Sequence, residues 1–227
     1  LERYPRDLDG DLAKLAPRGA QVVFTPSRET IYPAGHRTRV SVAGLTEGLC
    51  GACRPGHFDG VATIVAKLFC LVGPCAAVFG RKDYQQLQVI RRMAADLDLP
   101  VEIVGLPTVR EADGLALSSR NVYLPAADRQ RALSLSAGLG EGHRLWWSGE
   151  RRVGVLRRGV ETPVRAAADS IDYVAAADPD DLRPLDDGDT AGTRLLIAIA
   201  ARVGSTRLID NTVLGEDRPP PAAREAR

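Results

Sequence analysis

AAVFGRKDYQQL, residues 76–87, is the stretch that decides how this chain folds. A short apolar run ends at Gly80, and the polar residues after it lead into a segment whose apolar residues recur at helical spacing: Ile90, Met93, Ala94 and Leu97. A strand that ends in glycine and continues into a helix lets a ligand approach the backbone, and the first helical turn offers unpaired N–H groups. The stretch predicts a strand–turn–helix unit that binds phosphate. A solvated helix start with mixed charges is the alternative, because short motifs often match by chance.

Three polar side chains near Gly80 suit such a ligand. Lys82 adds a mobile positive charge, and Asp83 could accept a hydrogen bond from a ribose hydroxyl or hold a cation. Gln86 lies about one helical turn further on, so it can face the same ligand. These three side chains could therefore bind the same phosphate-bearing ligand at the turn.

Strands and helices alternate around this unit. An apolar helical face over 61–69 precedes it, and an apolar strand over 101–104 follows it. The alternation predicts a parallel α/β sheet with ligands at the carboxyl ends of the strands, where Gly80 lies. Further strands are expected at 21–25 and, at an edge, at 40–45. After residue 125 we expect a helix over 128–139, a strand over 171–174 and a hairpin of strands over 195–201 and 206–210.

A second polar stretch, PTVREADGLALSSRN, occupies residues 107–121. It has a central glycine and many charges, so it is expected to be a mobile surface loop. Two adjacent hydroxyls and a guanidinium on such a loop suit a triphosphate that is bound and then released as pyrophosphate.

Together the two stretches resemble the pantothenate synthetase (pantoate–β-alanine ligase) family. The family's Gly-x-Lys-Asp-x-x-Gln turn is matched at Gly80 to Gln86. Its Pro-Thr-Val-Arg-Glu-x-Asp-Gly-Leu-Ala-x-Ser-Ser-Arg-Asn loop is matched at Pro107 to Asn121. The order and separation also fit, and the resemblance extends over about residues 1–214, more weakly over 141–168. Arg81 departs from the family, in which this position is often acidic, and its positive charge is expected to alter nucleotide affinity.

The resemblance implies an α/β fold in two parts. An incomplete Rossmann-like nucleotidyltransferase domain with a parallel sheet would bind ATP and pantoate over residues 1–108. A smaller α+β carboxy-terminal lid domain would span 109–214. Residues 215–227 are rich in proline and charge, and their composition predicts a disordered tail.

The resemblance also implies an activity, an ATP-dependent condensation of pantoate with β-alanine through pantoyl adenylate, with release of AMP and pyrophosphate. Magnesium would accompany ATP, and no metal is expected to be bound by the protein itself. The implied catalytic residues are Lys82, Ser118, Ser119 and Arg120, and these would bind ATP together with Gly80, Arg81, Asp83, Val109 and Leu117. Gln86 would bind pantoate. His57 would lie close behind the site, although a structural donor at a helix start is the simpler interpretation.

One family segment has no counterpart in these residues. The family opens with Met-Gly-x-Leu-His-x-Gly-His, whose histidines bind ATP phosphates, and Leu1 aligns just after it. The chain that begins at Leu1 is therefore expected to be weakly active or inactive. The alternatives are a non-catalytic nucleotide-binding remnant or partner subunit, and a related adenylyltransferase that uses another acid.

The composition bears on the partners of the protein, on membrane association and on the role of its cysteines. The formal net charge is +1, which gives no indication of a nucleic-acid partner or a membrane surface. No apolar run approaches the ~20 residues of a membrane helix. We expect a cytoplasmic protein, and the resemblance implies a homodimer. The four cysteines, Cys50, Cys53, Cys70 and Cys75, could form a zinc site because the first two have the spacing C-x-x-C, but free thiols are the default expectation.

Overall fold

The structure is a computed structural model, and it describes residues 7–221. The chain divides into two compact units, one up to Thr38 and the other from Arg39 onward. The first unit contains α1 (Leu8–Leu15), a 3-10 helix (Ala16–Arg18) and α2 (Arg28–Ile31). Asp7 caps α1 by accepting a hydrogen bond from the main-chain N–H of Gly10 at 2.9 Å.

The prediction of a strand over residues 21–25 is wrong. These residues form no ladder, and the side chain of Val22 is 85% exposed. The apolar run has the composition of a strand, but a strand also needs a neighbouring strand to pair its backbone groups.

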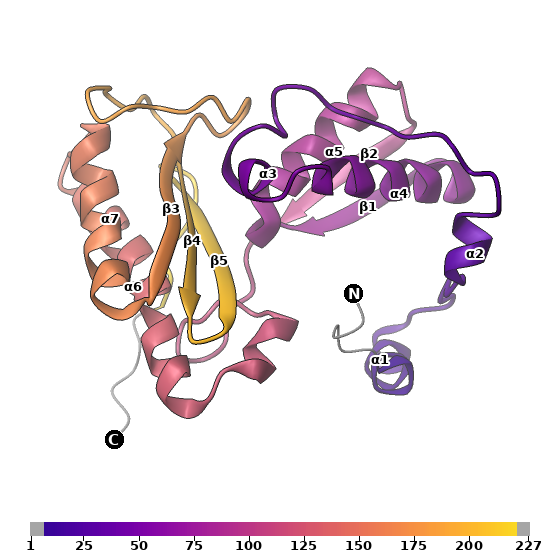
Figure 1. Ribbon diagram of the computed structural model, residues 1–227, viewed down its shortest axis with the longest axis horizontal. Helices are drawn as coiled ribbons and strands as arrows, with labels where there is room; N and C mark the ends of the chain where they lie inside the picture. Colours follow the sequence, from indigo (N-terminus) through magenta and orange to yellow (C-terminus); the bar gives the residue numbers. More distant parts are fainter. Residues whose placement is uncertain (1–6, 222–227) are drawn as a thin grey trace. The chain divides into compact units, whose positions relative to one another are not determined.

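The first half of the second unit contains the predicted strand–turn–helix. Its elements are α3 (Leu49–Cys53), α4 (His57–Val72), β1 (Cys75–Gly80), a 3-10 turn (Arg81–Asp83), α5 (Tyr84–Asp96) and β2 (Val101–Leu106). The two strands pair in parallel, from Cys75 opposite Val101 to Gly80 opposite Leu106 (Figure 1). The carboxyl ends of both strands therefore lie at one edge, where the turn begins.

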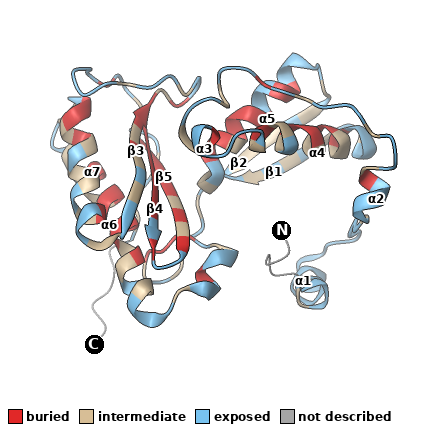
Figure 2. Ribbon diagram, viewed as in Figure 1, coloured by how far each residue is buried: buried red, intermediate tan, exposed pale blue. Residues whose placement is uncertain are grey.

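Helices α4 and α5 cover one face of this sheet. Phe69 of α4 and Ile90 of α5 are buried in a shared core, against which Phe79 and Ile103 of the strands pack. The opposite face is open, because Val78 is 59% exposed (Figure 2). The edge strand expected over 40–45 is wrong, since this segment forms no ladder. Instead, Val42 enters the same core and the N–H of Val40 donates to the Thr63 hydroxyl at 2.9 Å.

The second half is an α+β unit. It contains α6 (Ala126–Trp147), α7 (Val153–Ala167), β3 (Ser170–Ala177), β4 (Leu195–Val203) and β5 (Thr206–Leu214). The strands form an antiparallel sheet in the order β3-β4-β5, and Gly204, at φ 56°, turns the predicted β4–β5 hairpin. Helices α6 and α7 pack against the sheet through one core that includes Leu139, Leu156 and Ile197. Gly138 is needed there, because a Cβ would lie 2.4 Å from the main-chain oxygen of Val160.

No helix within residues 7–221 is long and apolar enough to cross a membrane.

Candidate functional site

The turn after β1 is held by the antiparallel sheet. Asn211 of β5 donates its side-chain amide to the main-chain oxygens of Arg81 at 3.1 Å and Lys82 at 2.6 Å. The Lys82 ammonium lies 4.0 Å from the Asp83 carboxylate, and the Asp83 side chain is half exposed. A Cβ at Gly80 would meet no atom within 4 Å, so space above the turn is open. The turn is thus fixed through its backbone, while the Asp83 carboxylate remains accessible and the Lys82 side chain is 19% exposed.

Arg81 is engaged by the carboxylates that follow β5. Its guanidinium pairs with Glu216 at 2.8 Å and Asp217 at 3.1 Å, and it lies 5.7 Å from the centre of the Tyr84 ring. The side chain keeps only 15% of its exposure. Its charge is therefore compensated within the protein. Both acids belong to the segment expected to be a disordered tail, of which residues 222–227 lie outside the described part.

The second stretch forms a narrow hairpin. Arg110 and Ala116 form an antiparallel bridge, and the N–H of Leu117 donates to the oxygen of Val109 at 2.9 Å. The side chains of Val109 and Leu117 are 65% and 55% exposed. Two exposed apolar side chains on paired residues offer a surface on which a planar base can pack.

Several charged contacts are made by this hairpin, whose sequence predicts a mobile surface loop. Arg129 of α6 binds Glu111 at 2.7 Å and Asp113 at 2.6 Å. Asn121 donates to Glu111 at 2.6 Å and to the oxygen of Ala116 at 3.1 Å. Hydrogen bonds from Arg129 and then from Asn121 lower the pKa of Glu111. The charge density that indicated mobility instead forms internal pairs.

A buried ion pair joins the hairpin to β5. Arg110 binds Asp210 through two hydrogen bonds, at 2.7 and 3.0 Å, and the two side chains are 11% and 2% exposed. Asp210 and Asn211 are not among the site residues predicted from the sequence. The available signal was two adjacent polar residues inside an apolar strand, where burial requires partners.

The Ser-Ser-Arg residues lie where the hairpin ends. Ser118 accepts a hydrogen bond from the N–H of Arg120 at 3.3 Å and begins a 3-10 helix (Ser119–Tyr123). The side chains of Ser119 and Arg120 are exposed. Arg120 also donates to the main-chain oxygen of Arg207 at 3.3 Å. One hydroxyl and one guanidinium thus remain available to a ligand.

His57 relates the turn to the hairpin electrostatically. Burial and then the charge of Arg54 lower the pKa of His57, while the carboxylate of Asp83 raises it and Arg120 lowers it. The charges of Asp83, in the turn, and Arg120, just after the hairpin, therefore both influence the pKa of the His57 imidazole. The Arg54 guanidinium is 2.9 Å from Nε2 of His57, which supports the simpler interpretation of His57 as a structural group.

Gln86 differs from the glutamines beside it on α5. Gln85 binds the 45–50 segment through Leu45, Gly48 and Cys50, and Gln88 donates to Tyr84 and to the oxygen of Pro179. Gln86 is half-buried, and its side-chain amide forms no hydrogen bond with any of residues 7–221. Its amide is free to bind a ligand.

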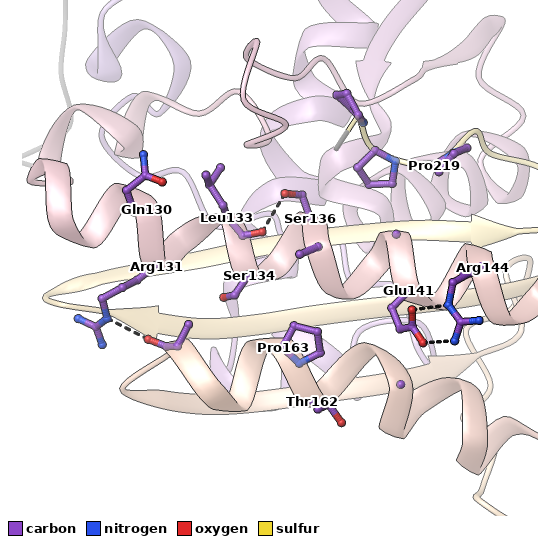
Figure 3. A pocket seen from close by; sticks show the side chains of 16 residues that line it. Gln130, Arg131, Leu133, Ser134, Ser136, Glu141, Arg144, Thr162, Pro163 and Pro219 are labelled. Atoms are coloured by element: carbon purple, nitrogen blue, oxygen red, sulfur yellow. Dashed lines mark hydrogen bonds and ion pairs between the residues drawn. The ribbon is translucent and has the colours of Figure 1, made fainter. Parts of the chain in front are cut away.

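Two other kinds of site are relevant here: a surface groove and a metal site. A groove of about 910 Å³ lies between α6 and α7, near Pro163 and Pro219 (Figure 3), and none of the predicted site residues line it. Within residues 7–221, no three His, Cys, Asp or Glu side chains are grouped closely enough to hold a metal ion. The four cysteines are free. The zinc alternative therefore has no support in the described structure.

Sequence comparison extends over most of the chain. The family model for pantoate-beta-alanine ligase matches residues 1–213. The pantothenate synthetase of Moorella thermoacetica is 55% identical over 213 residues, which are 93% of this chain and 74% of that protein. The pantothenate synthetase of Myxococcus xanthus is 51% identical over 216 residues, which are 95% of this chain and 74% of that protein. The chain thus spans about three quarters of the length of these relatives.

Structural comparison gives the same result. The crystal structure of pantothenate synthetase from Thermus thermophilus matches with a TM-score of 0.86 at 49% identity, over 92% of this chain and 75% of that one. Pantoate-beta-alanine ligase from Francisella tularensis, crystallised with Beta-gamma ATP and β-alanine, matches with a TM-score of 0.68 at 29% identity, over 95% and 73%. These neighbours confirm the predicted fold class, a Rossmann-like α/β part with a small α+β part. The matched length and identity show that the chain belongs to the pantoate–β-alanine ligase family, whose curated members compared above are pantothenate synthetases.

Proposed function

We propose that the turn and the hairpin form one site, which condenses pantoate with β-alanine at the expense of ATP. A single observation carries this proposal. Asp210 binds Arg110 of the hairpin, and its neighbour Asn211 binds the backbone of the turn. Two adjacent residues of β5 thereby anchor both family motifs, although each lies about a hundred residues or more away in sequence.

ATP would lie between the two motifs. Lys82, Ser119 and Arg120 offer positive charge and hydroxyl donors to the phosphates, with Ser118 at the start of the same 3-10 turn. Val109 and Leu117 would pack on the adenine, and Asp83 would accept from the ribose. Gly80 leaves room for the ligand to approach the backbone. Arg81 would contribute through its main chain, because its guanidinium is paired.

Pantoate would bind at Gln86, whose amide has no hydrogen-bond partner in the described structure. A pantoate carboxylate oxygen attacks the α-phosphorus, the bond to the β-phosphate breaks, and pyrophosphate leaves. The amine of β-alanine then attacks the carbonyl carbon of pantoyl adenylate, loses a proton, and AMP leaves. Neither step needs a nucleophile from the protein. The protein contributes position and charge neutralisation, and the β-alanine bound to the Francisella tularensis relative fits this sequence of steps.

Magnesium would reach this site with ATP. Mg²⁺ is commonly bound by one or two carboxylates together with substrate phosphates and water, and Asp83 is the exposed carboxylate at the turn. When bound, magnesium would neutralise charge on the leaving pyrophosphate.

The 227 residues tested alone are expected to be weakly active. They contain no His-x-Gly-His segment, and the relatives are longer than the matched region. One missing phosphate donor costs about 2.7–4 kcal/mol of transition-state stabilisation in a comparable site. From the family resemblance we also propose that the protein is cytoplasmic and forms a homodimer. Sedimentation analysis of the purified chain would test the homodimer.

Binding tests the proposal without requiring full activity. Isothermal titration of the chain with Mg-ATP, and separately with pantoate, should show one site for each. Lys82→Met should weaken ATP binding, and Gln86→Ala should weaken pantoate binding, each with little effect on the other ligand. Arg92→Ala, an exposed residue paired with Asp96, is the control and should change neither affinity. ATP binding that Lys82→Met leaves unchanged would place the nucleotide elsewhere.

A further inference from the structure

Two cysteines that the proposed reaction does not use lie on α3 beside the antiparallel sheet. The sulfur of Cys50 is 3.0 Å from the hydroxyl of Tyr173 on β3. Both terminal nitrogens of Arg207 on β5 donate to the same sulfur, at 3.8 and 3.9 Å. Asp172 holds Arg207 in place at 2.6 Å. A half-buried thiol is thus surrounded by a guanidinium and a phenol, two groups that can donate to a thiolate.

Cys53 lies three residues after Cys50, at the last position of α3. Burial raises the pKa of Tyr173, and so do the charge of Cys50, its hydrogen bond and the charge of Cys53. Tyr173 therefore keeps its proton at neutral pH and can donate it to the sulfur of Cys50. Cys50 is half-buried, whereas Cys53 is exposed to solvent.

The backbone of α3 brings the pair close to disulfide geometry. Residues three apart on a helix have Cβ atoms about 5–6 Å apart, and a disulfide needs about 3.5–4.5 Å. α3 has only five residues and ends at Cys53, so we infer that its last turn can open enough for the two sulfurs to bond. Gly51 lies between the cysteines because a Cβ there would be 1.8 Å from the oxygen of Thr46. Leu49 adopts a left-handed φ of 51°, which is costly for a residue with a side chain.

We propose that Cys50 and Cys53 form a redox-modification site, which a peroxide converts to an intrachain disulfide. The Cys50 thiolate attacks one peroxide oxygen, and the O–O bond breaks. The sulfur loses two electrons and becomes a sulfenic acid, while the peroxide is reduced to hydroxide, or to an alkoxide if it is organic. The Cys53 sulfur then attacks the sulfenic sulfur, the S–S bond forms, and the sulfenic oxygen leaves as water with the thiol proton.

Oxidation would remove a contact that links the two halves of the second unit. In the disulfide, the Cys50 sulfur turns toward Cys53 and away from Tyr173 and Arg207. The main-chain oxygen of Arg207 accepts a hydrogen bond from Arg120, so a shift of Arg207 reaches the hairpin. A dithiothreitol-reversible loss of ligase activity is therefore expected, and this consequence alone rests on the proposed function.

Tryptic digestion separates the four cysteines into two useful peptides. Because Arg54 precedes Pro55 and is not cleaved, cleavage at Arg39 and Lys67 gives peptide 40–67 with Cys50 and Cys53, and cleavage at Lys67 and Arg81 gives peptide 68–81 with Cys70 and Cys75. The intact chain is treated with hydrogen peroxide, alkylated and digested. Peptide 40–67 should lose its alkylation sites and become two hydrogens lighter than its reduced form, and dithiothreitol should restore it. Equal oxidation of peptide 68–81, or alkylated Cys50 and Cys53 after treatment, would overturn the proposal.

Two variants test the roles within the pair. Cys53→Ser should stop the reaction at the Cys50 sulfenic acid, which dimedone then traps. Arg207→Gln should slow oxidation of Cys50 about tenfold, because the thiolate loses a charged donor. Arg207→Lys should restore most of the rate, and Arg202→Gln, on the neighbouring strand, should leave it unchanged. If Arg207→Gln oxidises at the original rate while remaining folded by circular dichroism, the guanidinium does not activate Cys50 and the proposal fails.

Discussion

The side-chain amide of Asn211 donates a hydrogen bond of 2.6 Å to the main-chain oxygen of Lys82. Asn211 lies on an antiparallel strand, whereas Lys82 lies in the turn that follows a parallel strand. Asp210, which directly precedes Asn211 on β5, binds Arg110 of the hairpin. The β5 strand therefore sets the distance between the turn and the hairpin, and with it the geometry of the proposed phosphate site.

Replacement of Asn211 by Ala should loosen the turn. The change leaves the oxygens of Arg81 and Lys82 without their donor, and such a loss costs about 1–3 kcal/mol when the group is buried. We expect a lower free energy of unfolding in urea and weaker Mg-ATP binding. Thr212→Val is the matched control, because Thr212 is equally buried but binds His143. It should reduce stability without affecting ATP affinity; an equal loss of affinity in both variants would contradict a specific role for Asn211.

Breaking the Arg110–Asp210 pair should destabilise the second unit strongly. Asp210→Ala leaves a buried guanidinium unpaired, and removal of one partner of such a pair typically costs about 3–5 kcal/mol. Urea denaturation followed by circular dichroism measures this change. The double variant Arg110→Met with Asp210→Leu should be more stable than Asp210→Ala, because it removes both buried charges. A single variant that unfolds at the wild-type urea concentration would show that the pair carries little of the stability.

Lys82 and Arg120 should contribute directly to the adenylation step. Loss of one preorganised donor to a developing charge costs about 2.7–4 kcal/mol, or roughly 100-fold or more in rate. Lys82→Met and Arg120→Ala should therefore each reduce the rate of adenylate formation by about that factor, with little change in thermal stability. Arg92→Ala keeps the normal rate if only charges at the site matter. Rates of Lys82→Met and Arg120→Ala within threefold or so of the wild type would exclude both roles.

Acid should weaken the hairpin through Glu111. The pKa of Glu111 is lowered in the folded protein, first by Arg129 and then by Asn121, from an ordinary value of 4.5. The folded state thus favours the carboxylate, so this contribution is present above pH 4.5 and is lost as the pH falls through the lower folded pKa. Glu111→Gln should lower the urea midpoint at pH 7, and the difference from the wild type should shrink toward pH 3. A difference that stays constant with pH would assign the effect to packing.

The strand–turn–helix at Lys82 could be predicted because its signals are local. The apolar run, the glycine and the helical spacing all lie within about twenty residues, and the structure confirms them. The strand expected over 21–25 failed for the opposite reason, since its apolar pattern was present but no partner strand is formed. A strand's composition is visible in the sequence, whereas its pairing depends on residues elsewhere.

The anchoring of the site could not be predicted in the same way. Asn211 and Lys82 are 129 residues apart, and no periodicity relates a β5 residue to a turn after β1. The charges of Glu111, Asp113 and Arg129 were visible in the sequence, but their pairing was not, because Arg129 lies on a different element. The functional residues themselves were identified by resemblance to a family, and their roles in this chain stay predictions.

Pantoate-dependent exchange of labelled pyrophosphate into ATP is the decisive measurement for the proposed site. It reports adenylate formation alone, before β-alanine acts. The measurement is made with magnesium on the 227-residue chain and on the same chain preceded by the amino-terminal segment of the Thermus thermophilus relative. We expect exchange only when pantoate is present. It should be weak in the 227-residue chain and stronger in the extended form. Lys82→Met should abolish it. Exchange that proceeds equally without pantoate, or survives Lys82→Met in the extended form, would contradict the proposed site.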